Sequence, residues 1–445
     1  MNPMNPMNPR NPRNPIAEQL NRKLADTSIL DLLSDFGRRL YFPRGVVAQT
    51  AEAARDAHRF NATVGMATDG AEPLYLASIR RLIPELSAEE IFAYAPTGGL
   101  PELRRRWRDE IAAKNPGLRG PASLPMVTSG LTHGITVAAD LFVERGDLVI
   151  VPDLFWGNYR LIVEERRQAR LATVPFYGAN GGLGVDALAG AVGEIPAGGK
   201  AVLVLNFPNN PTGYTPTTAE MAALADVLRA AASRGVNLVV ICDDAYFGLF
   251  FESESCRESL FAYLADADER LLAVKVDGAT KENYVWGFRI GFLTFAARGL
   301  TDRHFAAFEQ KVMGAVRSSV SSSSMLAQSL LLRAMRTGTY HAEQQANLAA
   351  IAERYRLVRA ILAARAGDAG PLQPLPFNSG YFLTLRMAGG KAEVLRQELL
   401  RRRGVGTISV GDDYLRVAFS TVASADLEAL FEEIYSVARE VAAGS

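Results

Sequence analysis

From about residue 120, short runs of apolar and β-branched residues alternate with longer segments whose apolar positions recur at helical spacing. Most of the short runs lack regular polar positions, which is typical of strands covered on both faces. One intervening segment, 218–235, has the pattern of a helix that ends in glycine. Together the seven runs predict an α/β fold, with a mainly parallel seven-stranded sheet and helices on both faces. The runs cover residues 124–129, 147–153, 170–176, 201–207, 237–244, 271–278 and 289–295.

The last part of the chain has a different pattern. A long helical segment at 342–367 is followed by a strand-like run at 379–387, a second helix at 391–403 and an apolar run at 414–420. This order predicts a smaller α+β domain.

The domain boundaries are predicted from these changes of pattern. Residues 80–330 form the large domain and residues 331–445 the small C-terminal domain, with the segment 16–79 packing against the small domain. Residues 1–15 consist of five copies of x-Asn-Pro. Because proline every third residue is incompatible with helix and sheet ladders, we expect a disordered tail there.

Composition excludes several classes of protein. The chain has 48 Lys plus Arg and 48 Asp plus Glu, so no overall field favours nucleic acid or an anionic membrane as a partner. No apolar run reaches the length of a membrane span, and the N-terminus lacks the apolar stretch of a signal peptide. The two cysteines, Cys242 and Cys256, form neither a disulfide framework nor a zinc spacing, which predicts a cytoplasmic location and no metal site.

Open parallel sheets bind ligands at the carboxyl ends of their strands, so the residues after each run are candidates for a site. The first run turns into a helix through "SGLTHG", 129–134, where free N–H groups and the hydroxyls of Ser129 and Thr132 can hold an anion. The alternative there is ordinary N-capping. Trp156 follows the second run and can stack on a flat ring, although a tryptophan is also a common core residue.

The fourth and fifth runs end in polar residues. Asn210 lies in "NFPNNPTGY" and can aim its amide into a cleft, or belong to a plain turn. Asp243 ends an apolar strand, where burial of a carboxylate is costly unless it is paired, and a protonated ring nitrogen would suit it. Tyr246 can donate to an oxygen on the same ring. The alternative for Asp243 or Asp244 is a helix cap.

The sixth run leads into "VDGATKENYVWGFRIGF", which contains Lys281 and Arg289. A desolvated lysine at a strand end can act as a nucleophile, and an arginine fork suits a phosphate. Taken alone, the pair can also be two surface cations. Taken with the groups above, it matches a phosphorylated pyridine aldehyde, whose aldehyde Lys281 binds and whose ring nitrogen Asp243 keeps protonated.

Over about residues 60–425 the chain resembles the class I/II aminotransferases of the fold-type I pyridoxal-phosphate family. The resemblance rests on "NPTG" at 210–213, on Asp243 with Tyr246, and on Lys281 followed eight residues later by Arg289 within "GFRIG". It implies further site residues: Gly130, Leu131 and Thr132 for the phosphate turn, Trp156 for ring stacking, Arg416 for the substrate α-carboxylate, Gly65 for a substrate contact, and Tyr94, which reaches the partner subunit's phosphate.

The chain departs from the family pattern at one phosphate position. The family usually carries a serine three residues before the cofactor lysine, and here that residue is Gly278. The resemblance leaves Thr280 to take over part of the role.

The resemblance also implies a reaction. Pyridoxal phosphate is the expected cofactor, held by the large domain, and an amino group passes from an L-amino acid to a 2-oxo acid by a ping-pong mechanism through Lys281. Homodimers with shared sites are expected. Arg317 falls where some members carry an arginine for a distal carboxylate, which would indicate a dicarboxylic substrate, or it has a structural role.

Three other interpretations were open. Residues 182–187, "GLGVDA", match G-x-G-x-x-A, but the next segment looks too short for the crossover helix that a dinucleotide site needs. A lyase or other non-transaminating enzyme of the same cofactor family would use the same residues. A non-catalytic regulator on this fold is disfavoured because Lys281 is retained.

Overall fold

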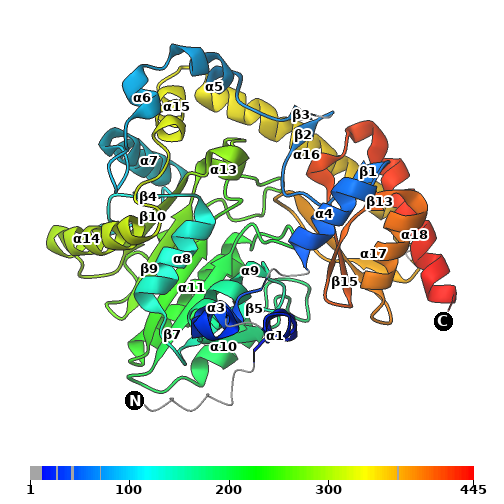
Figure 1. The fold of residues 1–445 in the computed structure, drawn as a ribbon, viewed down its shortest axis with the longest axis horizontal. Coiled ribbons are helices and arrows are strands. Elements are labelled where there is room, and N and C mark those ends of the chain that lie inside the picture. The colour runs from blue at the N-terminus through cyan, green and yellow to red at the C-terminus, as the bar shows by residue number, and fades with distance from the viewer. Residues whose placement is uncertain (1–12, 27–28, 42–44, 71, 368–369, 445) are drawn as a thin grey trace.

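A seven-stranded sheet forms the centre of the larger part of the molecule (Figure 1). The computed structural model describes residues 13–26, 29–41, 45–70, 72–367 and 370–444. The order across the sheet is β4-β10-β9-β8-β7-β5-β6, and only β10 runs antiparallel to its neighbours. Each predicted run holds one of the strands, which confirms the mainly parallel sheet: β4 (Met126–Thr128), β5 (Leu148–Pro152), β6 (Arg170–Val174), β7 (Lys200–Asn206), β8 (Asn237–Asp243), β9 (Leu271–Asp277) and β10 (Gly291–Ala296).

Both faces of the sheet are covered, because alternate residues of the central strands belong to two different apolar cores. On β7, Val202 and Val204 pack on the side of α8 (Leu131–Phe142). Leu203 and Leu205 pack on the other side, where the helices are α10 (Val185–Gly193), α11 (Thr218–Ser233) and α12 (Leu260–Leu264). The two-sided burial explains the continuous apolar runs of the sequence.

The helix α10 corrects one expectation. The segment after "GLGVDA" looked too short for a crossover, yet this nine-residue helix links β6 to β7, which lie on either side of β5. The irregular segments before and after α10 supply the length that the helix itself lacks.

A smaller antiparallel sheet has the order β11-β12-β15-β14, with β11 (Leu372–Pro374), β12 (Phe382–Met387), β14 (Ile408–Val410) and β15 (Tyr414–Ala418). The helix α17 (Ala392–Arg403) packs on β14 and β15 and against α18 (Leu427–Ala443). Figure 1 shows the 25-residue helix α16 (Tyr340–Ala364) running from the region of α15 (Met325–Met335) towards this second sheet. The boundary at residues 330 and 331 stays a prediction.

The N-terminal segment divides its contacts between the two parts. The helix α4 (Val46–Asp56) packs on α17, and β1 (Phe60–Asn61) pairs in parallel with β13 (Val405–Gly406). The helix α3 (Asp35–Arg39) instead contacts the π-helix η2 (Leu161–Arg166), where Arg39 Nε donates to the Glu165 carbonyl at 3.1 Å. The boundary at residues 79 and 80 also stays a prediction.

The x-Asn-Pro tail, predicted for residues 1–15, lies mostly outside the described residues. Its last pair does have structure, because Asn14 caps α1 (Pro15–Arg22) and accepts a hydrogen bond from the Ile16 amide at 2.9 Å. The first N–H groups of a helix have no partner within the helix, so a proline at the first position costs no hydrogen bond. Asn14 and Pro15 therefore start a helix instead of excluding one. Among the described helices, none is both long and apolar enough to cross a membrane.

The turn after β7 joins the two sheets. The carbonyl of Gly213 accepts hydrogen bonds from the amides of Asn378 and Ser379, both at 2.9 Å, just before β12 begins. Gly213 has φ +74°, and a Cβ built on it would lie 2.0 Å from the Phe382 carbonyl oxygen. The glycine of "NPTG" is therefore required both by its backbone conformation and by the close approach of β12.

Replacing Gly213 by alanine is expected to lower the free energy of unfolding by roughly 3 kcal/mol or more, because the backbone of β12 must move. Gly198 is the matched control: it has φ +80° but no atom within 4 Å of its built Cβ. Gly198→Ala is expected to cost only about 1 kcal/mol, from its left-handed backbone. Urea unfolding of both variants measures the difference, and equal losses would contradict the close approach.

Candidate active site

A cavity of about 210 Å³ opens at the carboxyl ends of the large sheet, on the side of α8. It brings together ten of the predicted site residues: Gly65, Leu131, Thr132, Trp156, Asn210, Asp243, Tyr246, Thr280, Lys281 and Arg289. Four further residues complete its lining, namely Ile135, Asn206, Ala245 and Trp286.

Lys281 supplies the amine of this cavity. It lies on the four-residue helix α13 (Ala279–Glu282), and its Nζ is 4.8 Å from the centre of the Tyr246 ring. The side chain is half-buried. Burial lowers the pKa of Lys281 to about 8, with Arg289 acting in the same direction and the charge of Asp243 against it. A useful fraction of the amine is therefore unprotonated near neutral pH, as a nucleophile or base requires.

Asp243 supplies the carboxylate and ends β8, 3% exposed. Its Oδ1 accepts from the Ala245 amide at 3.1 Å, and its Oδ2 accepts a short hydrogen bond from the Tyr159 hydroxyl. Burial raises the pKa of Asp243, while the bond from Tyr159 and the charge of Lys281 lower it. The carboxylate therefore depends on its donors to stay ionised.

Tyr159 was missed by the sequence interpretation. It lies on the short helix α9 (Asn158–Arg160), three residues after Trp156, and the two rings meet edge to face with centres 5.6 Å apart. The π-helix η2 follows directly, and such helices are frequent beside functional sites.

The start of α8 and Arg289 together provide donors suited to an anion. Gly130, at φ +82°, precedes the helix, whose first N–H groups have no side-chain cap among the described residues. A Cβ on Gly130 would lie 2.5 Å from Arg289 Nη2, so the guanidinium packs directly against this turn. Ordinary N-capping is therefore wrong for "SGLTHG". Ser129 is not part of the lining, and its hydroxyl pairs with Ser323 at 3.2 Å.

Gly278 and Thr280 explain the departure from the family's serine. A Cβ on Gly278 would lie 2.6 Å from the Ile290 carbonyl oxygen, so a serine does not fit there, and Gly278 does not line the cavity. Thr280 does line it, is 2% exposed, and its hydroxyl has no hydrogen-bond partner within the described part of the chain. Such an unsatisfied buried hydroxyl is suited to a ligand oxygen.

Arg416 lies beside this cavity, in β15, and is 2% exposed. It donates from Nη1 to Asn210 Oδ1 at 3.0 Å and from Nη2 to the Thr63 carbonyl at 2.7 Å. Among the described residues, its Nε has no hydrogen-bond partner and its guanidinium forms no ion pair with a carboxylate. Burial lowers the pKa of Arg416 to about 10.

A second cavity, of about 470 Å³, shares Trp156 and Asn210 with the first and is lined by Arg416. The small sheet and the large sheet thus meet at these residues. Gly65 is close by, since a Cβ there would lie 3.2 Å from the Tyr246 hydroxyl oxygen.

Asn206 was missed by the sequence interpretation, although it is the last residue of β7. It accepts from the Asn210 amide at 2.8 Å and donates to the Asp243 carbonyl at 2.7 Å.

Five predicted residues are not among those that line the first cavity: Gly130, Gly278 and Arg416, described above, and Tyr94 and Arg317. Tyr94 is 93% exposed. Arg317 is exposed on α14 (Asp302–Ser319), where its Nη1 donates to the Ser321 hydroxyl at 2.5 Å. Both roles involve a partner subunit and stay predictions.

A family model described as aminotransferase class I and II matches residues 63–434. The chain belongs to this family. It is 25% identical over 250 residues to a probable N-acetyl-LL-diaminopimelate aminotransferase of Bacillus subtilis, covering 56% of this chain and 57% of that protein. It is 32% identical over 203 residues to a probable N-succinyldiaminopimelate aminotransferase of Mycobacterium tuberculosis, covering 45% of this chain and 47% of that protein. The matched segments thus span about half the length of these curated aminotransferases.

Solved aminotransferases share the fold over most of their length. An aminotransferase from Anaerococcus prevotii has a TM-score of 0.80 at 20% identity, covering 91% of this chain and 98% of that one. Aspartate aminotransferase from Thermus thermophilus has a TM-score of 0.70 at 21% identity, covering 91% and 99%.

Tyr159→Phe is expected to raise the pKa of Asp243 further, because the donor to its carboxylate is lost while its burial remains. The ¹³C shift of the labelled carboxyl group, followed against pH, measures the change. Tyr263→Phe, which removes a hydroxyl that contacts Cys256 and not Asp243, is the control and should leave that titration unchanged. An unaltered titration in Tyr159→Phe would show that the hydroxyl does not act on Asp243.

Proposed function

We propose that the protein is a pyridoxal-phosphate-dependent aminotransferase that moves an amino group between an L-amino acid and a 2-oxo acid. The observation that carries this proposal is one cavity that contains Lys281, buried Asp243 and the anion site of Arg289 at the start of α8. Class I and II aminotransferases use pyridoxal phosphate. The activity and the substrates of the whole chain are proposals.

The residues of the cavity fit this cofactor. Asp243 would hold its ring nitrogen, Tyr246 its ring oxygen, and Trp156 one face of the ring. The first N–H groups of α8, Arg289 and the unsatisfied hydroxyl of Thr280 would hold its phosphate. When bound, pyridoxal phosphate supplies an electron sink beside the substrate's α-carbon.

Lys281 has two tasks in this proposal. It would hold the cofactor through its aldehyde before substrate arrives, and then act as base and acid on the proton of the substrate's α-carbon. A pKa of about 8 suits both tasks, because the amine can accept that proton and return it near neutral pH.

Arg416 and Asn210 would bind the substrate's α-carboxylate. Arg416 has a free Nε and no described carboxylate partner, so a carboxylate would satisfy it without displacing an existing ion pair. Gly65 leaves space beside them. The named relatives act on diaminopimelate derivatives or aspartate, and Arg317 would contact a distal carboxylate if the substrate is dicarboxylic.

We also propose a homodimer with shared sites, in which Tyr94 reaches the partner's cofactor phosphate. Its almost complete exposure in the single chain suits such a contact. A cytoplasmic location is proposed from the two cysteines, Cys242 and Cys256, which are free and buried.

Lys281→Ala is expected to reduce amino transfer by at least about a thousandfold, because no other side chain of the cavity can relay the proton. The full chain with pyridoxal phosphate is mixed with single amino acids and a 2-oxo acid, and the new amino acid and new 2-oxo acid are measured. Borohydride should fix the cofactor to Lys281, as mass spectrometry of the peptide would report. Lys311→Ala, an exposed lysine on α14, is the control.

Product release without a 2-oxo acid acceptor would indicate a lyase instead. Absence of both cofactor fixation and transfer in the parent protein would overturn the proposal.

Arg416→Lys is expected to raise KM for the amino acid by about ten- to a hundredfold with a smaller effect on kcat, because a charged bidentate contact is lost. Arg386→Lys, an exposed arginine of β12 in the same small sheet, is the control and should behave like the parent protein. Equal KM values in both variants would remove Arg416 from the substrate site.

A further inference from the structure

A second lysine, Lys275, lies behind the cavity and is not used by the proposed reaction. It is in the middle of β9 and only 1% exposed. Apolar residues of β8 and β9 at odd and even positions face different cores: Ile241 and Val276 face the core on the α8 side, whereas Cys242 and Ala273 face the core of α11 and α12. Lys275 therefore points away from the cavity that contains Lys281.

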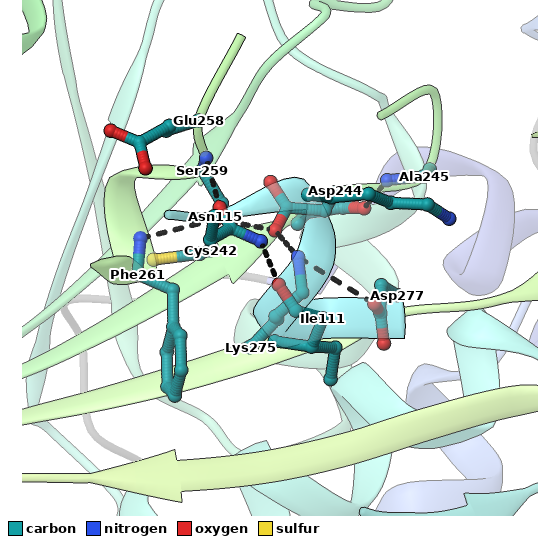
Figure 2. A network of polar contacts seen from close by, with 12 residues as sticks. Ile111, Asn115, Cys242, Asp244, Ala245, Glu258, Ser259, Phe261, Lys275 and Asp277 are labelled. Atoms are coloured by element: carbon teal, nitrogen blue, oxygen red, sulfur yellow. Dashed lines mark hydrogen bonds and ion pairs between the residues drawn. The ribbon is translucent and has the colours of Figure 1, made fainter. Parts of the chain in front are cut away.

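The ammonium of Lys275 lies between two buried carboxylates, as Figure 2 shows. It forms a short ion pair with Asp244, the residue after β8, and a second ion pair with Asp277 at 3.5 Å, at the end of β9. It also lies 4.6 Å from the centre of the Phe247 ring. Burial of an unpaired ammonium would be costly, and here two opposite charges and an aromatic face replace water.

Both carboxylates are connected to the same helix, Asp277 directly and Asp244 through Ser259. Asp244 accepts from the Ser259 hydroxyl at 2.6 Å, and the Ser259 amide donates to Asn115 Oδ1 at 2.7 Å (Figure 2). Asp277 accepts from Trp107 Nε1 at 3.1 Å. Trp107 and Asn115 belong to the helix α7 (Pro101–Lys114) and its C-terminal cap. The cluster thus ties the ends of β8 and β9 to one rigid helix.

Asp244 and Asp277 are close in sequence to Asp243 and Lys281, the two charged groups that line the cavity. Asp244 directly follows Asp243, and its amide donates to the Val276 carbonyl at 2.9 Å. Asp277 and Gly278 directly precede α13, which carries Lys281. A shift of either strand end would therefore change the separation of Asp243 and Lys281 across the cavity.

The far end of α13 is held by similar contacts. Glu282 forms an ion pair with Lys114 at 2.7 Å, and the Tyr381 hydroxyl donates to the Lys281 carbonyl at 3.0 Å. The four residues of α13 are too few for a stable isolated helix, so their position depends on such contacts.

We propose that Lys275 is a positioning residue for Lys281 and Asp243: its ion pairs with Asp244 and Asp277, on the opposite face of the sheet, fix the two strand ends that carry them. The kinetic part of this inference rests on the proposed function, whereas the geometric part concerns this chain alone.

The test removes the short ion pair of Lys275 with Asp244, and leaves Asp277 with the hydrogen bond from Trp107 and the nearby charge of Lys114. Lys275→Met with Asp244→Asn keeps the volumes and removes both charges, an exchange that is often neutral for stability. In the full chain freed of cofactor, competitive labelling of amines with acetic anhydride is followed against pH, and the Lys281 peptide is measured by mass spectrometry.

We expect the double variant to unfold at a urea concentration near that of the parent. We expect the pKa of Lys281 to rise from about 8 towards its ordinary value of 10.5, because a displaced α13 lets water reach the amine and burial is the main cause of its lowered pKa. With pyridoxal phosphate, kcat should fall by about tenfold with little change in KM, because the reacting groups are misplaced while substrate binding is retained. A folded double variant with the parent's Lys281 pKa and kcat would overturn the proposal.

Two further variants complete the test. Lys200→Met removes a lysine–aspartate pair at the other end of the sheet, between Lys200 of β7 and Asp147 at 2.6 Å, and should leave the pKa of Lys281 unchanged. If the double variant does not fold, Asp277→Asn is measured instead. A rise in the pKa of Lys281, smaller than the rise expected for the double variant, supports the proposal. An unchanged pKa of Lys281 overturns it. If the parent shows no amino transfer, the proposed function fails, while the labelling result still tests the positioning.

Discussion

The burial of charge at the carboxyl ends of β8 and β9 is the constraint on which the site depends. A carboxylate or an ammonium placed in a protein interior must be paired or hydrogen-bonded, or it changes its protonation state. On the cavity side, Asp243 has Tyr159 and the charge of Lys281. On the opposite side, Asp244 and Asp277 share Lys275. Each side therefore has its own partners, and neither relies on solvent.

Close backbone packing places the start of α8, the candidate anion site, next to the buried charges at the ends of β8 and β9. The built Cβ of Gly291 would lie 2.7 Å from the carbonyl carbon of Gly130, and that of Gly278 would meet the Ile290 carbonyl. Three glycines thus let the start of α8, the start of β10 and the approach to α13 touch without side chains between them. The same packing excludes a serine at position 278, while the hydroxyl of Thr280, which lines the cavity, has no partner among the described residues.

Much of the fold and part of the site could be predicted from the sequence. The seven strands are confirmed, and two-sided burial explains why most of the runs are apolar throughout, although the edge strand β6 is partly exposed. The rule of carboxyl-end sites then selected the residues after β4, β5, β7, β8 and β9. Tyr159 and Asn206 were not predicted, because each contacts a residue distant in sequence, Asp243 in both cases. No local pattern encodes such a contact. Lys275 was included in an apolar run, since its two carboxylate partners are only apparent in space. The crossover α10 was misjudged because helix length alone ignores the loops beside it.

Lys275 in β9 and Lys281 in α13 have opposite shifts in pKa. Burial lowers the pKa of both, but the outcome depends on the charges that accompany it. At Lys275, the carboxylates of Asp244 and Asp277 outweigh burial and raise the pKa to about 12. At Lys281, the single charge of Asp243 is opposed by Arg289, and the pKa falls to about 8. Near neutral pH the amine of Lys281 is therefore partly unprotonated, whereas that of Lys275 stays protonated. Two lysines six positions apart in one segment thus differ in environment: Lys281 lines the cavity with a lowered pKa, and Lys275 lies behind it as a paired cation.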